Sequence, residues 1–115
     1  MQEIKAIIRP DRLSAVIHAL HQIPLMPGVT VSLVQGFGRG EAHQLEAVDP
    51  FAVDPFGEAR FAKLEVVVPT ALVKPVVDAI RMMAHTGRPG DGKIFVIPVD
   101  DVTRISTGEA GEAGI

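Results

Sequence analysis

Cysteine, tryptophan and tyrosine are all absent from this 115-residue sequence, and phenylalanine supplies its only five aromatic residues. Without cysteine, the chain can form neither a disulfide framework nor a metal site built on thiolates. No apolar run approaches the roughly 20 residues that a membrane-spanning helix needs. The first segment interleaves its apolar residues with Glu3, Lys5 and Arg9, unlike a signal peptide. We therefore expect a cytoplasmic protein without direct membrane insertion.

A strong charge of one sign is missing as well. The formal net charge is −3, from 11 basic and 14 acidic residues, so the electrostatic signature of a nucleic-acid binder is absent. The length of 115 residues allows one domain. With 47% apolar and 22% charged residues, the composition is that of an ordered globular protein. Because so short a chain buries a small fraction of its surface, association of several copies would stabilise it.

Hydrophobic periodicity predicts four strands and two helices. Strands are expected over residues 3–9, 29–37, 61–68 and 93–99. One helix should follow Pro10 with Asp11 as its N-cap, and another should follow Pro69 with Thr70 as its N-cap. Pro75 should delay or kink that second helix. The order βαββαβ predicts an α+β, ferredoxin-like fold, in which an antiparallel four-stranded sheet carries both helices on one face.

The sheet face without helices would expose apolar side chains to water unless something covers it. Valine and isoleucine occur on both faces of the first, third and fourth strands, which indicates that other subunits cover it. The C-terminal tail, residues 100–115, ends in glycine, alanine and glutamate. We expect the last residues of this tail to be mobile.

Two glycine clusters mark a candidate anion site. Gly36 and Gly38 end the second strand, where missing side chains let a ligand approach the backbone. The turn at 86–92 holds three more glycines, which can aim successive N–H groups at an anion. A cation follows each cluster, Arg39 or Lys93, and this combination predicts phosphate binding. An ordinary turn is the alternative for any single glycine.

Five segments of the chain resemble successive signature segments of the PII signalling family, in the same order and at the same spacing. They lie at residues 4–10, 34–39, 64–69, 86–95 and 104–109. The resemblance covers nearly the whole chain except residues 40–60, so the chain is identified as a divergent PII-like member with one domain over 1–115. This resemblance implies a homotrimer that acts as a regulatory protein and not as an enzyme.

The resemblance also implies that ATP, ADP or AMP binds between subunits, with Mg²⁺ as a candidate companion, and that residues 86–92 form a phosphate loop. The residues carried over by position are Thr30 and Val67 for the adenine, Gly36, Phe37, Gly38 and Arg39 for the wall at the strand end, Gly87, Asp91, Gly92 and Lys93 for the phosphates, and Arg104 from the neighbouring chain.

The effector loop of the family would span residues 38–60, and here it departs from the family pattern. Gly40 and Glu41 stand where conventional members have glutamine and lysine, and Ser106 replaces a second arginine. Because a 2-oxoglutarate dianion needs positive partners, we rank bicarbonate, with its single charge, above it as the second ligand. A conventional nitrogen regulator that senses 2-oxoglutarate is the alternative.

Covalent control of the loop is excluded by its composition. The chain has no tyrosine, and residues 39–60 contain no serine or threonine, so no hydroxyl there can accept a uridylyl or phosphoryl group. The loop instead repeats AVDPF at 47–51 and 52–56. Phe51 and Phe56 are therefore candidate contacts to a protein target, a membrane transporter or an enzyme. A tandem duplication without function is the alternative.

Other classes of function find less support. His18 and His21 lie three residues apart on the first helix, but we favour a solvated helix face over a metal pair. A metal-tolerance protein of the same trimeric architecture is disfavoured by the absence of cysteine. No paired acid and base, and no nucleophile with a histidine, can be located, so we expect neither an enzyme nor a metal site. Nucleotide binding that depends on Lys93 would separate these classes.

Overall fold

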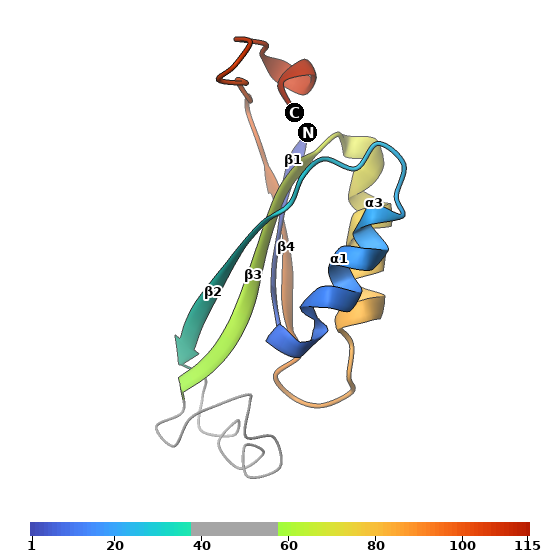
Figure 1. Cartoon of the computed structure of the whole chain (residues 1–115), viewed down its shortest axis with the longest axis vertical. Helices are drawn as coiled ribbons and strands as arrows, with labels where there is room; N and C mark the ends of the chain where they lie inside the picture. Colours follow the sequence, from blue (N-terminus) through green and yellow to red (C-terminus); the bar gives the residue numbers. More distant parts are fainter. Residues whose placement is uncertain (38–57) are drawn as a thin grey trace.

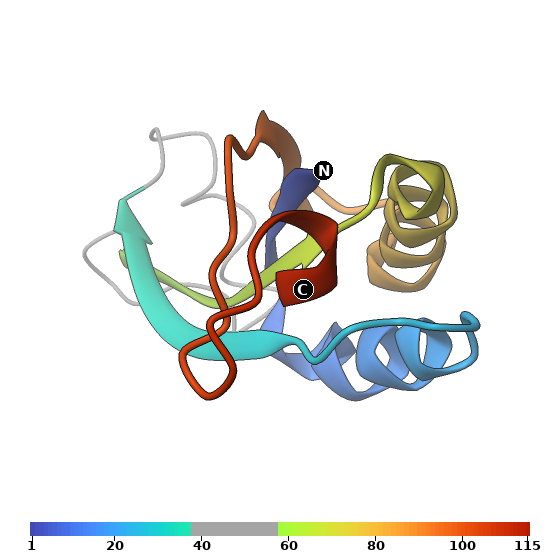
Figure 2. The same cartoon turned by 90° about the horizontal axis from the view of Figure 1, so that it is seen from above.

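The computed structural model describes residues 1–37 and 58–115. Its sheet has the strand order β2-β3-β1-β4, and all neighbouring strands are antiparallel. The strands are β1 (Gln2–Ile8), β2 (Thr30–Phe37), β3 (Glu58–Val68) and β4 (Gly92–Pro98). Two helices, α1 (Leu13–His21) and α3 (Thr70–Ala84), lie on one face of this sheet (Figure 1, Figure 2). The expected ferredoxin-like fold is confirmed.

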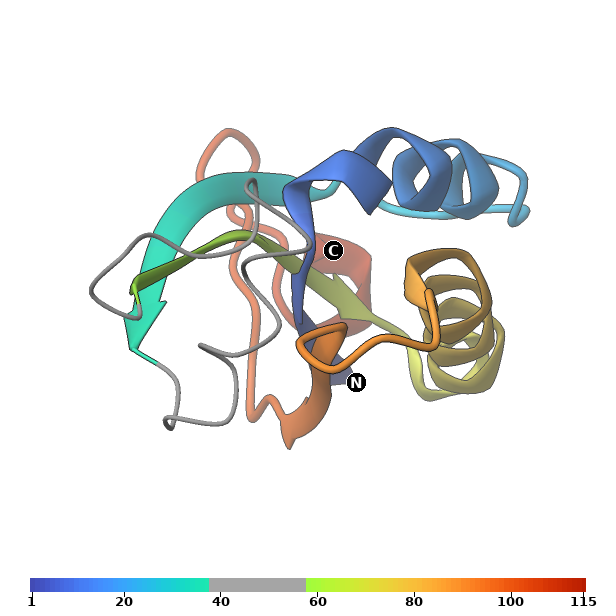
Figure 3. The same ribbon diagram turned by 90° about the horizontal axis from the view of Figure 1, so that it is seen from below.

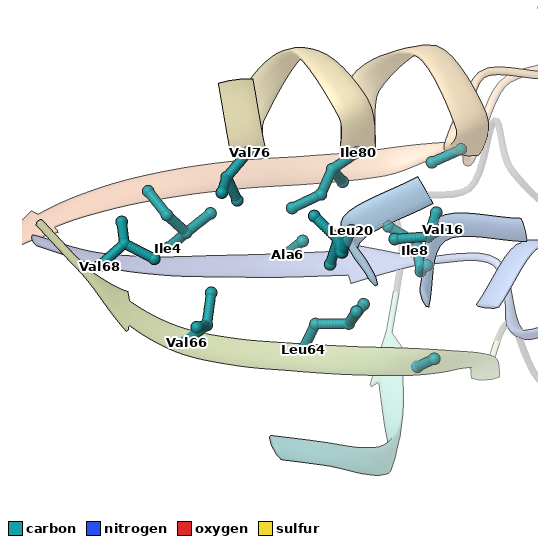
Figure 4. Close-up of a cluster of buried hydrophobic side chains, with 12 residues drawn as sticks. Ile4, Ala6, Ile8, Val16, Leu20, Leu64, Val66, Val68, Val76 and Ile80 are labelled. Carbon is teal, nitrogen blue, oxygen red and sulfur yellow. The ribbon is translucent and has the colours of Figure 1, made fainter. Parts of the chain in front are cut away.

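The hydrophobic core fills the layer between the sheet and the two helices (Figure 4). Every second residue of a strand faces the helices, and residues three or four apart on each helix face the sheet. The buried side chains are Ile4, Ala6 and Ile8 of β1, Ala62, Leu64, Val66 and Val68 of β3, Val16 and Leu20 of α1, and Val76, Ile80 and Ala84 of α3. Burial of each large aliphatic side chain stabilises the fold by roughly 1.5–3 kcal/mol. Among the described residues, no helix is long and apolar enough to cross a membrane.

Both helix N-termini differ from the expected caps. Asp11 lies inside a short 3-10 helix, Pro10–Arg12 (η1), and neither η1 nor α1 has a side-chain cap. Thr70 is the first residue of α3, and its hydroxyl donates to the side chain of Gln2 at 3.0 Å. The predictions of Asp11 and Thr70 as N-caps are therefore wrong. Pro10 is the first residue of η1, and Pro69 occupies the N-cap position of α3, where its side chain has no oxygen to accept a helix N–H group.

Pro75 neither delays nor interrupts α3, which runs from Thr70 to Ala84. The helix buries Val76 and Ile80 immediately after this proline. Packing of that face outweighs the one backbone hydrogen bond that proline removes. The expectation of a delayed helix is therefore wrong, and a kink at Pro75 stays a prediction.

The limits of the strands differ from the sequence prediction, by one residue in β1, β2 and β4 and by three at the start of β3. β3 begins at Glu58, so residues 58–60 belong to the sheet and not to the loop expected over 38–60. Gly92, expected in the glycine-rich turn, is the first residue of β4. The remainder of the predicted loop, with Gly38, Arg39, Phe51 and Phe56, lies outside the described residues.

The tail after β4 is folded, so the expectation of mobile last residues is wrong. A bridge between Thr103 and Ala110 closes a turn. A second 3-10 helix, Gly111–Gly114 (η2), follows, and Gly114 is buried. The tail lies at the upper end of the molecule, beside the N-terminus (Figure 1, Figure 2).

The face of the sheet opposite the helices keeps large apolar side chains at the surface. Phe95 and Ile97 of β4 are 43% and 36% exposed. They pair in register with Lys5 and Glu3 of β1, and successive residues of a strand alternate between faces. Phe95 and Ile97 therefore lie on the other face of the sheet from the buried Ile4. This is the face that the sequence predicts other subunits to cover.

Leu25 has an unfavourable backbone conformation, with φ at +62° in a non-glycine residue. It follows Pro24 in a turn that the N–H of Met26 closes on the carbonyl of Ile23 at 3.3 Å, the pattern of a type II turn, which favours glycine at this position. The side chain is 95% exposed. We expect Leu25→Gly to raise the free energy of unfolding by about 0.5–1 kcal/mol, measured by urea denaturation. Leu25→Ala keeps the positive φ and should give no such gain; an equal gain would contradict this explanation.

Candidate functional site

The loop between α3 and β4, together with the first residue of β4, contains three glycines with positive φ. It lies beside the end of β1 (Figure 3), where Gly92 pairs with Ile8. Gly87, Gly90 and Gly92 have φ angles of +84°, +90° and +103°, which glycine adopts without the penalty of a Cβ atom. These three glycines allow the tight turns of this segment.

Asp91 is the centre of the hydrogen bonds that hold this loop. Its carboxylate accepts the N–H groups of Thr86 at 2.8 Å and Gly87 at 3.1 Å, and also the Thr86 hydroxyl. Partial burial by itself would raise the pKa of Asp91. The hydrogen bonds from Thr86, Arg9 and Gly87 outweigh it and lower the pKa of Asp91 to about 2. The carboxylate is therefore ionised at neutral pH and faces the loop's own backbone.

Two arginines of the corner between β1 and α1 hold the segment from the end of α3 to the start of β4. Arg9 donates from Nε to Asp91 Oδ1 at 3.0 Å and from Nη2 to the carbonyl of Pro89 at 2.7 Å. Arg12 donates from Nε to the carbonyl of Met83 at 2.8 Å, near the end of α3, where a cation also suits the helix dipole. Arg9 is buried. The sequence analysis did not identify Arg9, although a charge directly after a strand of alternating buried residues was a usable signal.

Strong acid should weaken the loop, because it protonates Asp91. The pKa of Asp91 is lowered from 3.8 to about 2 in the folded chain, so its contribution is fully present above about pH 4 and is lost as the pH falls through 2. We expect a loss of about 2 kcal/mol in the free energy of unfolding over this interval, measured by urea titrations. Asp91→Asn should lack this part of the pH dependence; an unchanged profile would contradict it.

Lys93 supplies a positive charge immediately after the loop. It pairs with Ile7 across β1 and β4 and lies on the open face of the sheet, exposed. Within residues 1–37 and 58–115, the ion pairs involve other cations, and none is formed by Lys93. Its ammonium group is an exposed cation directly after the glycine turn, which itself carries Arg88. A compact point charge suits a phosphate.

The remaining predicted site residues are spread over the sheet. Gly36 and Phe37 end β2 at the same lower end as the loop, but on the opposite edge of the sheet (Figure 1). Arg104 lies in the tail at the upper end, where its guanidinium donates to the carbonyl of Ile115. One chain brings together Gly87, Asp91, Gly92 and Lys93, and it leaves Thr30, Val67, Gly36, Phe37 and Arg104 apart from them.

The histidines of the described chain do not gather into a metal site. His18 and His21 are both exposed on α1. His85 is also exposed, with Nδ1 at 3.7 Å from Asp91 Oδ2. Among the described residues, no group of three or more histidines and carboxylates could hold a metal ion.

Comparison with known proteins gives consistent matches over the length of the chain. The family model described as "Nitrogen regulatory protein P-II" matches residues 1–109. The chain is 46% identical to the nitrogen regulatory protein P-II of Azospirillum brasilense over 112 residues, which are 96% of each chain. It is 43% identical to nitrogen regulatory protein P-II 1 of Escherichia coli K12 over 116 residues, covering both chains completely. A crystal structure of Arabidopsis thaliana PII bound to citrate matches with a TM-score of 0.79, at 39% identity, over 99% of this chain and 91% of that one.

Proposed function

The chain belongs to the nitrogen regulatory protein P-II family, and we propose that it is a trimeric regulatory protein that binds ATP, ADP or AMP between its subunits. The loop of residues 85–91, followed by Lys93, is the observation that carries this proposal. Gly87 and Gly90 in this loop and Gly92 directly after it have positive φ. The ammonium of Lys93 has no ion-pair partner in the described chain. Such a loop and cation suit a chain of phosphates.

The positions of the other predicted residues favour a site that two chains share. Arg104 lies at the end of the sheet opposite the loop within one chain, so the two could meet on one ligand only if they come from different copies. The apolar side chains on the open face, Phe95 and Ile97 among them, give those copies a surface to bury. A trimer would satisfy both features. Thr30, Val67, Gly36 to Arg39 and Arg104 would then complete the pocket, with Mg²⁺ accompanying ATP.

The names of the relatives favour nitrogen regulation as the process controlled. The solved relative is bound to citrate, an anion, which is in keeping with a second anionic ligand beside the nucleotide here. Bicarbonate and 2-oxoglutarate are the two candidates. The missing cations at Glu41 and Ser106 favour bicarbonate, which carries the smaller charge. We further propose that the protein works in the cytoplasm, without catalysis, on a protein target such as a transporter or an enzyme.

Isothermal titration with ATP, ADP and AMP tests the nucleotide site, with light scattering on the same sample for the trimer. Each titration is repeated with bicarbonate and with 2-oxoglutarate. We expect micromolar binding to a trimer, strengthened by one of the two anions. Strengthening by 2-oxoglutarate alone would show that the lost charges do not matter. Absence of binding for all three nucleotides would overturn the proposed function and leave the family assignment in place.

A further inference from the structure

Arg9 and Asp91 form a buried ion pair that joins the end of β1 to the glycine loop. The Nε atom of Arg9 lies 3.0 Å from Asp91 Oδ1, and only 7% of the Arg9 side chain and 23% of the Asp91 side chain are exposed. The same guanidinium also holds the carbonyl of Pro89 at 2.7 Å. Arg9 thus binds the loop at two points, Asp91 and Pro89. The Asp91 carboxylate also accepts the N–H groups of Thr86 and Gly87.

We propose that Arg9 and Asp91 are positioning residues for the phosphate groups of the ligand, acting through the shape of the loop and through its charge. This inference rests on the proposed nucleotide site. It assigns the two residues no direct contact with the ligand. The bonds of Asp91 to Thr86 and Gly87 set the curvature of the loop, and those of Arg9 to Asp91 and Pro89 fix the loop against the sheet.

The charge of the pair matters as much as its shape. Asp91 lies two residues before Lys93, and its carboxylate is ionised at neutral pH. An unpaired carboxylate there would repel a phosphate and offset the attraction of Lys93. Because Arg9 neutralises Asp91 inside the loop, this carboxylate no longer offsets the attraction of Lys93 for an anion. Arg9 therefore acts on the ligand through Asp91.

This arrangement predicts an effect that grows with the number of phosphates. In Arg9→Gln, ATP affinity should fall by about 10- to 30-fold. The reason is that the unpaired Asp91 carboxylate would oppose the charge-assisted contact between Lys93 and a phosphate. AMP affinity should fall less, and the affinity for adenosine should stay within about twofold. Arg9→Lys keeps the charge but not the planar fork that reaches both Asp91 and Pro89, so it should fall between the wild type and Arg9→Gln.

The double variant Arg9→Gln/Asp91→Asn separates charge from shape. It removes both charges, so the repulsion that Arg9→Gln creates is gone, and ATP affinity should recover by about threefold or more relative to Arg9→Gln. If Arg9 served stability alone, the second substitution would remove further loop bonds and could only lower the affinity. Lys74→Gln is the matched control, because it removes one cation from an exposed pair with Asp78 on α3, remote from the loop.

The experiment is isothermal titration of the five proteins with ATP, AMP and adenosine, after urea denaturation has established the temperature at which all are folded. Loss for ATP but not for adenosine, with recovery in the double variant, is the expected result. Wild-type affinity for ATP in Arg9→Gln, or an equal loss for ATP and adenosine, would overturn the inference while leaving the nucleotide site intact. A wild-type protein that binds no ATP would overturn the proposed function, and this inference with it.

Discussion

Gly92→Ala is expected to destabilise the chain by at least about 3 kcal/mol. A Cβ atom on residue 92 would lie 1.7 Å from the main-chain oxygen of Ile7 and 2.8 Å from its carbonyl carbon. These atoms belong to β1, the strand that pairs with both β3 and β4. Relief of the clash would therefore require displacement of a central strand, and the φ of +103° adds strain of its own. The midpoint of urea denaturation measures the loss.

Gly87→Ala is the matched control for this prediction. Its φ is +84°, similar to that of Gly92, but the nearest atom to the new Cβ would be His85 Nε2 at 3.9 Å. The substitution should therefore cost only the conformational penalty, about 1–2 kcal/mol. Equal losses in the two variants would show that backbone conformation alone requires glycine at residue 92 and that the approach of β1 does not.

Most of the fold could be predicted because the apolar residues follow the periods of their elements. The alternation in β1 and β3 and the spacing of Val76 and Ile80 in α3 are what the core requires. The helix starts could not be predicted from capping residues, since proline sets them. The fold of the tail was also missed. Its composition is that of a mobile end, whereas a bridge and buried Gly114 hold it.

The candidate site was predicted only in part. The glycine clusters and Lys93 are local patterns, and local patterns are visible in a sequence. The partner of Asp91 is not, because Arg9 lies 82 positions away and only the pairing of β1 with β4 brings the two together. The sequence predicted Asp91 as a phosphate contact, and that role stays a prediction. In the structure its carboxylate is occupied by Thr86, Gly87 and Arg9.

Lys93→Gln is expected to lower the affinity for ATP by about 10- to 100-fold. A hydrogen bond to a charged group contributes about 1.5–3 kcal/mol, which corresponds to this range in the dissociation constant. Because Lys93 is exposed and forms no ion pair within the described residues, the substitution should change the free energy of unfolding by less than about 0.5 kcal/mol. Isothermal titration with ATP and adenosine measures the effect, and adenosine affinity should be unchanged.

Lys63→Gln tests whether Lys93 contacts ATP directly or only adds to the positive charge of the open face. Lys63 of β3 and Lys93 of β4 both pair with Ile7 of β1, which lies between them. Both side chains therefore lie on the open face of the sheet. Lys63 differs in forming an ion pair with Glu65 at 3.5 Å, and β1 separates it from the loop. Its loss should change ATP affinity by no more than about threefold at 0.15 M salt, where distant surface charges are screened. If both substitutions weaken ATP equally, Lys93 contributes only to the overall charge of this face, and the loop would have to bind phosphate through its backbone.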